Sequence, residues 1–96
     1  MNKIKFNNTE FEVLNYNKTT YFNSESINSN GSCSILTDNI ETVNELAEDP
    51  IDSIQIYHDD ELIYNLQNAN AHISTTNEYF NGERMDISIS LTFDIE

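Results

Sequence analysis

Residue types that carry out catalysis are scarce in this 96-residue chain. It holds a single cysteine, two histidines, a single arginine and two glycines. A glycine-rich phosphate loop and a zinc–thiolate centre need more glycines and cysteines than these, and a cysteine–histidine pair lacks the residues that would support it. We therefore expect no enzymatic activity and no bound cofactor.

Carboxylates are the plentiful reactive group, and two short acidic runs could bind a hard cation. Residues 58–61 read His-Asp-Asp-Glu, and Asp49 is followed by Asp52. Neither run has the spacing or the glycine of the calcium-binding loop. Paired carboxylates also hydrolyse glycosides, but no spacing here marks two acids as a pair. Both runs are interpreted as solvent-exposed turns, so no metal site is expected.

Net charge is the most unusual property of the sequence, at −13, and it is confined to one part of the chain. Residues 1–37 balance three lysines against three acids, whereas residues 38–96 hold fourteen acids against Arg84 alone. The acidity can serve solubility or form a negative face for a basic partner. Its sign disfavours direct binding to nucleic acid, and no apolar run is long enough for a membrane span, so neither partner is expected.

One short helix is predicted over residues 39–48. Asp38 can cap it, Glu41 can complete the capping box, and the proline at position 50 ends it. Helical spacing predicts one buried face, formed by Ile40, Val43, Leu46 and Ala47. The opposite face carries Glu41, Glu45 and Glu48, with no basic residue at the favourable spacing for a helical ion pair. These acids are therefore free to face solvent or a partner.

Most of the remaining chain alternates in the manner of half-buried strands. Unbroken alternation predicts one long strand over residues 85–95, and residues 4–13 and 54–66 predict two hairpins. The pair Asn30-Gly31 suits a type I′ turn, which would reverse the chain into a strand over residues 33–37. Cys33 in that strand is interpreted as a small buried residue. The expected fold class is mainly β (α+β), an antiparallel sheet or small sandwich with one short helix, in a single domain over residues 1–96.

Tyr57 is the most suggestive aromatic residue. It falls on the strand face opposite Ile54 and Ile56, which is the wet side of its predicted hairpin. An exposed tyrosine beside acids offers a protein partner both apolar area and a hydrogen bond. The alternative, which the sequence leaves open, is that the tyrosines cap a small core.

Three segments of the chain resemble the compact β modules found in bacteriophage tails and necks, from phages of low-GC hosts. They are residues 4–13, the predicted hairpin over residues 54–64 and the alternating C-terminal segment. The resemblance implies a structural or assembly protein that binds other proteins, in the virion or the host cytoplasm. Small acidic phage proteins also include inhibitors of host defence, anti-CRISPR-like proteins among them, some of which imitate the charge of nucleic acid. Such an inhibitor is the alternative function.

Either function would use a contact surface of acids and tyrosine. The candidate partner-binding residues are Glu41, Glu45, Glu48, Tyr57, Asp59, Asp60 and Glu61. The expected partner is a protein, and for the inhibitor it is one with a basic, nucleic-acid-binding groove. Association of two copies through a β edge is a further alternative.

Overall fold

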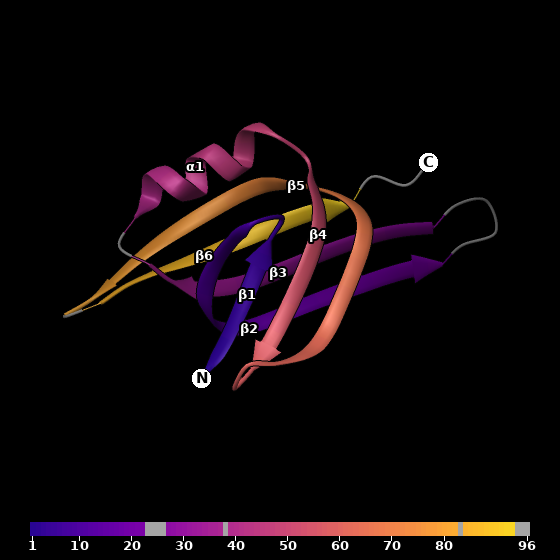
Figure 1. The fold of residues 1–96 in the computed structure, drawn as a ribbon. Coiled ribbons are helices and arrows are strands. Elements are labelled where there is room, and N and C mark those ends of the chain that lie inside the picture. Colours follow the sequence, from indigo (N-terminus) through magenta and orange to yellow (C-terminus); the bar gives the residue numbers. More distant parts are fainter. Residues whose placement is uncertain (23–26, 38, 83, 94–96) are drawn as a thin grey trace.

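Six antiparallel strands close into a barrel, with one helix packed against it, in the residues that the structure describes (Figure 1). The structure is a computed structural model and describes residues 1–22, 27–37, 39–82 and 84–93. The strands are β1 (Asn2–Phe6), β2 (Thr9–Phe22), β3 (Ile27–Leu36), β4 (Ile51–His58), β5 (Glu61–Asn81) and β6 (Arg84–Phe93), and the helix is α1 (Ile40–Glu48). Their order around the barrel is β1-β2-β3-β6-β5-β4. The mainly β fold class with one short helix is confirmed.

The first strand closes the barrel because it pairs on both sides. Ile4 lies opposite Phe11 of β2 and opposite Ile56 of β4. The β1–β2 turn is tied to β4, since the side-chain oxygen of Asn7 accepts hydrogen bonds from the backbone N–H groups of Asp52 (2.9 Å) and Ser53 (3.2 Å). The predicted hairpin over residues 4–13 is therefore confirmed. Because β1 also pairs with β4, this hairpin closes the barrel.

The core fills the barrel with the inward-facing residues of the alternating strands. Its buried members are Ile4, Phe6, Phe11, Val13, Cys33, Ile35, Val43, Ile51, Ile54, Ala69, Ala71, Ile87, Ile89, Leu91 and Phe93. The alternation predicted for the C-terminal strand is confirmed from Ile87 to Phe93, and Ile95 lies outside the described residues. Cys33 is fully buried, as its alternating neighbours predicted.

The turn predicted at Asn30-Gly31 is wrong, because both residues lie inside β3 and pair with β2 and β6. A glycine is needed there for a different reason. A Cβ atom on Gly31 would lie 2.9 Å from the backbone oxygen of Asn17 and 3.0 Å from Cε2 of Phe93. The glycine therefore allows a close approach between strands, which a local pattern cannot distinguish from a turn.

β5 begins as the second strand of the hairpin predicted over residues 54–66, and it continues far beyond that hairpin, to Asn81. Its first half pairs with β4 and its second half with β6. Between the two halves, Asn68 and Asn70 adopt φ angles of 56° and 47°, a left-handed conformation that asparagine tolerates better than most residues. The strand therefore bends from one wall of the barrel to the other without ending (Figure 1).

The helix begins one residue later than predicted and has a different cap. The side-chain oxygen of Asn39 accepts a hydrogen bond from the backbone N–H of Thr42 (3.3 Å), so Asn39 is the N-cap, and Asp38 lies outside the described residues. Val43 is buried, and Ile40 and Leu46 are half-buried against the core. Ala47 is exposed, contrary to prediction, because the helix contacts the barrel along its i, i+3 row, from which Ala47 is displaced. No helix in the described part of the chain is long and apolar enough to cross a membrane.

Two hairpins extend beyond the barrel in opposite directions (Figure 1). The β2–β3 pairing reaches Phe22 opposite Ile27, and the β5–β6 pairing reaches Asn81 opposite Arg84. The molecule is elongated as a result, with extents of 47 × 28 × 20 Å.

Candidate functional site

The outer face of α1 presents three of the predicted contact residues to solvent. Glu41, Glu45 and Glu48 are all exposed. Within the described residues none of the three forms an ion pair. The predicted exposure of this negative face is confirmed, and its role in binding a partner stays a prediction.

The β4–β5 turn presents three more acids. Asp59 and Asp60 have φ angles of 47° and 69°, and they connect His58 to its cross-strand partner Glu61 in a two-residue turn. The N-terminal ammonium group forms an ion pair and hydrogen bond with Asp59, and this contact, with a smaller effect of His58, lowers the pKa of the Asp59 carboxyl. Asp60 and Glu61 are exposed.

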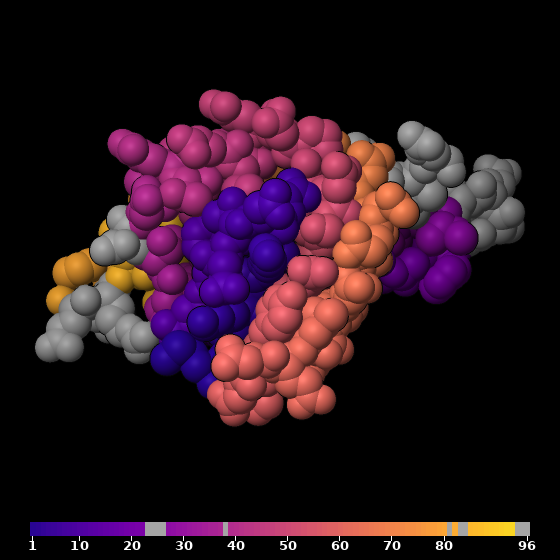
Figure 2. Space-filling view, in the orientation of Figure 1, coloured from indigo at the N-terminus to yellow at the C-terminus, as the bar shows by residue number. Residues whose placement is uncertain are grey.

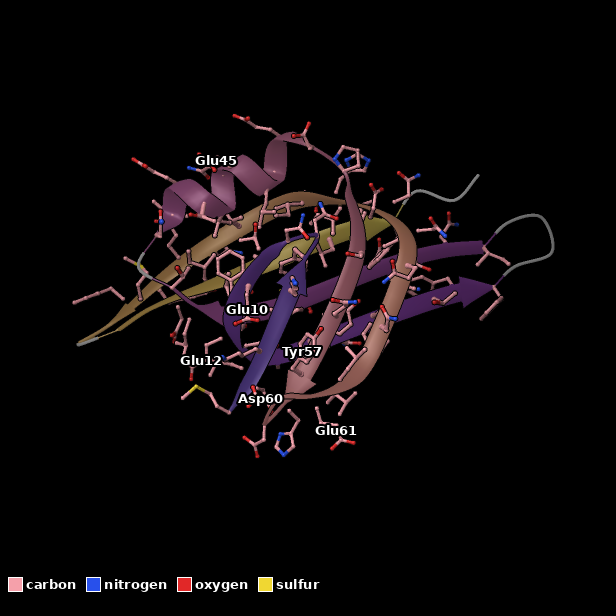
Figure 3. The ribbon with its side chains drawn as sticks, viewed as in Figure 1. Glu10, Glu12, Glu45, Tyr57, Asp60 and Glu61 are labelled. Atoms are coloured by element: carbon pink, nitrogen blue, oxygen red, sulfur yellow. The ribbon has the colours of Figure 1, made fainter. Side chains whose placement is uncertain are left out.

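The two acidic clusters do not form one surface. Glu45 lies at the top of the molecule, whereas Asp60 and Glu61 lie at the bottom (Figure 3). In the space-filling view β1 occupies the middle of this face, between α1 and the β4–β5 hairpin (Figure 2). β1 carries Lys3 and Lys5, and Lys3 Nζ lies 3.5 Å from Glu10 Oε1. Positive and neutralised groups therefore separate the helix acids from the turn acids.

Tyr57 lies on the face between the two acidic clusters (Figure 3). It is half-buried and pairs across the strands with Lys3. Its hydroxyl donates a hydrogen bond to Gln55 Oε1 (3.3 Å), and the Gln55 amide donates one to Asn65 Oδ1 (3.3 Å). Tyr57 is therefore part of a polar ladder on the outer face of the sheet, and it is less accessible than a protruding contact residue.

Apolar residues are exposed at the tips of two hairpins, and the sequence analysis did not predict either patch. Phe22 is 76% exposed at the β2–β3 tip, beside Tyr21 and Ile27. Phe80 is 73% exposed at the β5–β6 tip, next to Tyr79. The signal was present in the sequence, because neighbouring residues of a strand face opposite sides and two consecutive aromatics cannot both enter one core. We call these the β2–β3 tip and the β5–β6 tip.

A hollow of about 670 Å³ lies beside the β2–β3 tip. Lys18 and Thr20 of β2 and Ser29 of β3 line one side of it, and the bend of β5 at Asn68 and Asn70 lines the other. Lys18 Nζ lies 5.0 Å from the centre of the Phe93 ring, a cation–π distance. The Thr20 and Ser29 hydroxyl oxygens lie 3.2 Å apart. The hollow is therefore a polar recess with an apolar floor, open to solvent at one end of the barrel.

No arrangement in the described residues supplies an evident catalytic centre. No three histidine, cysteine or carboxylate side chains in that part of the chain come together to hold a metal ion. Cys33 is fully buried, and burial raises the pKa of its thiol to about 12. A protonated, inaccessible thiol is a poor nucleophile.

The reactivity of Cys33 gives a direct test of this burial. At mildly alkaline pH we expect a thiol-reactive reagent to modify Cys33 only as fast as the fold opens, with full reactivity in denaturant. The pKa of the Cys33 thiol is near 9.0 in the unfolded chain and about 12 in the folded one, so the folded state binds this proton more tightly. Cys33 therefore lowers the free energy of unfolding as pH rises from about 9 towards 12. Native-state modification at the rate of a free thiol would contradict the burial of Cys33.

No protein-family model matches this sequence, and a search of curated proteins finds no similar one. The chemistry of the exposed surfaces is therefore the basis for a functional proposal.

Proposed function

We propose that the protein is a non-catalytic, protein-binding module that is built into a larger assembly, in the phage context that the sequence resemblance suggests. The observation that carries the proposal is the exposure of the aromatic residues at the two hairpin tips, above all Phe22 and Phe80. Exposed aromatic side chains that protrude from a fold are typical anchors of protein interfaces, because each buries a large apolar area when a partner covers it. Two tips that point in opposite directions suit a subunit that links two neighbours.

Mass spectrometry of purified virions and of their assembly intermediates tests this proposal. We expect the protein in one of these fractions, and we expect Phe22→Ser and Phe80→Ser to reduce its incorporation by about tenfold or more while the isolated chain stays folded. Ile63→Ser is the matched control, because Ile63 is also exposed (59%) but lies away from both tips. Absence of the wild-type protein from particles and intermediates would remove the proposal.

A second candidate is an acidic inhibitor that occupies a basic, nucleic-acid-binding groove of a host-defence enzyme. It is supported by the exposed acids of α1, which form no ion pair within the described residues. Because the helix acids and the turn acids lie on opposite sides, two separate variants are needed. One replaces Glu41, Glu45 and Glu48 by Gln, and the other replaces Asp60 by Asn and Glu61 by Gln.

The readout for this candidate is DNA cleavage by host-defence nucleases in the presence of each variant. If the acids imitate nucleic acid, one variant loses inhibition with its fold unchanged, and wild-type inhibition weakens steeply with salt, since exposed charges are screened over about 8 Å at physiological ionic strength. If both variants inhibited as well as wild type, or if inhibition did not change with salt concentration, the acidity would serve solubility alone.

A further inference from the structure

The second part of β2 has an open edge. β1 pairs with β2 only from Thr9 to Glu12, whereas β3 pairs with β2 as far as Phe22. Over residues 15–22, which we call the β2 edge, no strand among the described residues pairs with the other side. Figure 1 shows that side of β2 without a neighbouring ribbon towards its arrowhead. Every second residue of an antiparallel strand directs its N–H and C=O away from its one partner. The β2 edge is therefore a row of backbone donors and acceptors that can bind another strand.

The β2 edge has few of the features that usually protect such edges. Natural edge strands are blocked by charged side chains, especially lysine, by proline, by bulges or by inward-pointing charges. The register of residues 15–22 against β3 is regular, and the segment reads Asn-Tyr-Asn-Lys-Thr-Thr-Tyr-Phe, without proline. Lys18 is its single charge, and that ammonium group lies over the Phe93 ring rather than out along the edge. The irregular pairing between Val13 and Asn15 precedes the segment, and Lys18 is the one protective residue within it, so most of the β2 edge is open to strand addition.

Side chains of an added strand would also find a recess beside it. Lys18 and Thr20 alternate along the β2 edge and line the hollow of about 670 Å³. In an added strand, every second side chain would lie on the same face as these two residues and so point towards the hollow. Main-chain hydrogen bonds with recesses for alternate side chains are the two elements of peptide recognition by strand addition.

We infer that the β2 edge binds an extended, uncharged segment of a different protein whose surrounding surface is basic; this rests on the proposed protein-binding function. Among the described residues that line the hollow, one is a cation, Lys18, and one an acid, Asp52, so together they favour no charged side chain. The net charge of −13 attracts a basic partner and repels a second copy of the chain. Two copies paired about a two-fold axis at Lys18 would in addition place like charges opposite each other. A heterologous, basic partner is therefore the occupant that charge favours.

Hydrogen–deuterium exchange of the free chain and of the chain in its assembly tests the inference. We expect the amides of residues 15–22 to exchange about tenfold more slowly in the assembly, because an added strand protects the outward-facing groups. The β4–β5 turn at Asp59 and Asp60 serves as the internal control and should exchange equally in both states. Unchanged exchange over residues 15–22 in an assembly that contains the protein would overturn the inference and leave the proposed function standing.

Edge-blocking variants give the second readout. Asn17→Lys and Thr19→Lys place a charge on exposed positions of the β2 edge, whereas Asn44→Lys makes the same change in net charge on an exposed position of α1. We expect about tenfold less of either edge variant than of the Asn44→Lys control in the assembly. The midpoint of thermal unfolding should be the same for all three variants as for wild type. Equal incorporation of edge and control variants would overturn the inference.

The isolated chain distinguishes the second copy from a different partner. Sedimentation should show a monomer, and a dimer abolished by Asn17→Lys would assign the β2 edge to self-association and overturn the inference of a heterologous partner. If neither the wild-type protein nor the tip variants Phe22→Ser and Phe80→Ser were found in any assembly, the proposed function itself would be contradicted.

Discussion

Replacing Leu91 by alanine is expected to lower the free energy of unfolding by about 2–5 kcal/mol, the usual cost of deleting a buried leucine side chain. Leu91 is 2% exposed, in a strand that pairs on both sides, and its cross-strand partners are Gly31 of β3 and Ile73 of β5. Glycine fills none of the space that the leucine would leave, so the cavity has little means to collapse. Urea unfolding of the two proteins measures the difference.

Ser90→Ala is the matched control, one position earlier in the same strand. Ser90 is half-buried, and its backbone oxygen accepts a hydrogen bond from Ser74 Oγ (3.1 Å), which alanine retains. We expect a change of no more than about 0.5 kcal/mol. Because a shift of one residue exchanges the two faces of a strand, equal effects of the two substitutions would contradict the register of β6.

Gly31→Ala is expected to destabilise the protein by about 1–3 kcal/mol, although alanine is normally tolerated in a strand. The new Cβ would meet the backbone oxygen of Asn17 at 2.9 Å, and the backbone of β2 would have to move to relieve the contact. On its other side the Phe93 ring is 7% exposed and lies under Lys18, so it has little freedom to retreat. These contacts outweigh the small entropic gain of replacing glycine.

Ser32→Ala separates this steric effect from a general effect of substitution in β3. Ser32 is the next residue of the strand and is exposed, so its replacement should leave the midpoint of thermal unfolding nearly unchanged. A crystal structure of Gly31→Ala should show β2 displaced near Asn17. If Gly31→Ala unfolded at the wild-type temperature, the close approach of β2, β3 and β6 would be contradicted.

Some features of the fold follow from short-range patterns and were predictable. The helix over residues 40–48 is encoded by apolar spacing and a proline after its end, and the strand through Ile87, Ile89 and Leu91 by strict alternation. The position of the β4–β5 turn followed from a polar run between two apolar ones. Each pattern depends on residues within a few positions of one another, which is the range over which backbone geometry repeats.

The candidate site was predictable only in part. The exposure of Glu41, Glu45 and Glu48 followed from the opposite face of an amphipathic helix. That these acids lie across the molecule from Asp60, with Lys3 between the two groups, depends on the pairing of β1 with both β2 and β4. No periodic pattern in the sequence predicts that β1 pairs with both of these strands.

By itself the sequence determined the mainly β class, the single described helix, the burial of Cys33 and the scarcity of catalytic residue types. Only the tertiary structure decided that the sheet closes into a barrel, that Gly31 lies within a strand and that β5 continues through its bend. It also decided that no strand in the described part of the chain pairs with one side of the β2 edge. The physical reason is that strand pairing joins residues far apart in the chain, as Lys3 joins Tyr57 and Gly31 joins Leu91. Such contacts depend on the packing of the whole core. A local sequence pattern determines only which side of a strand or helix each residue lies on, not which distant strand it packs against.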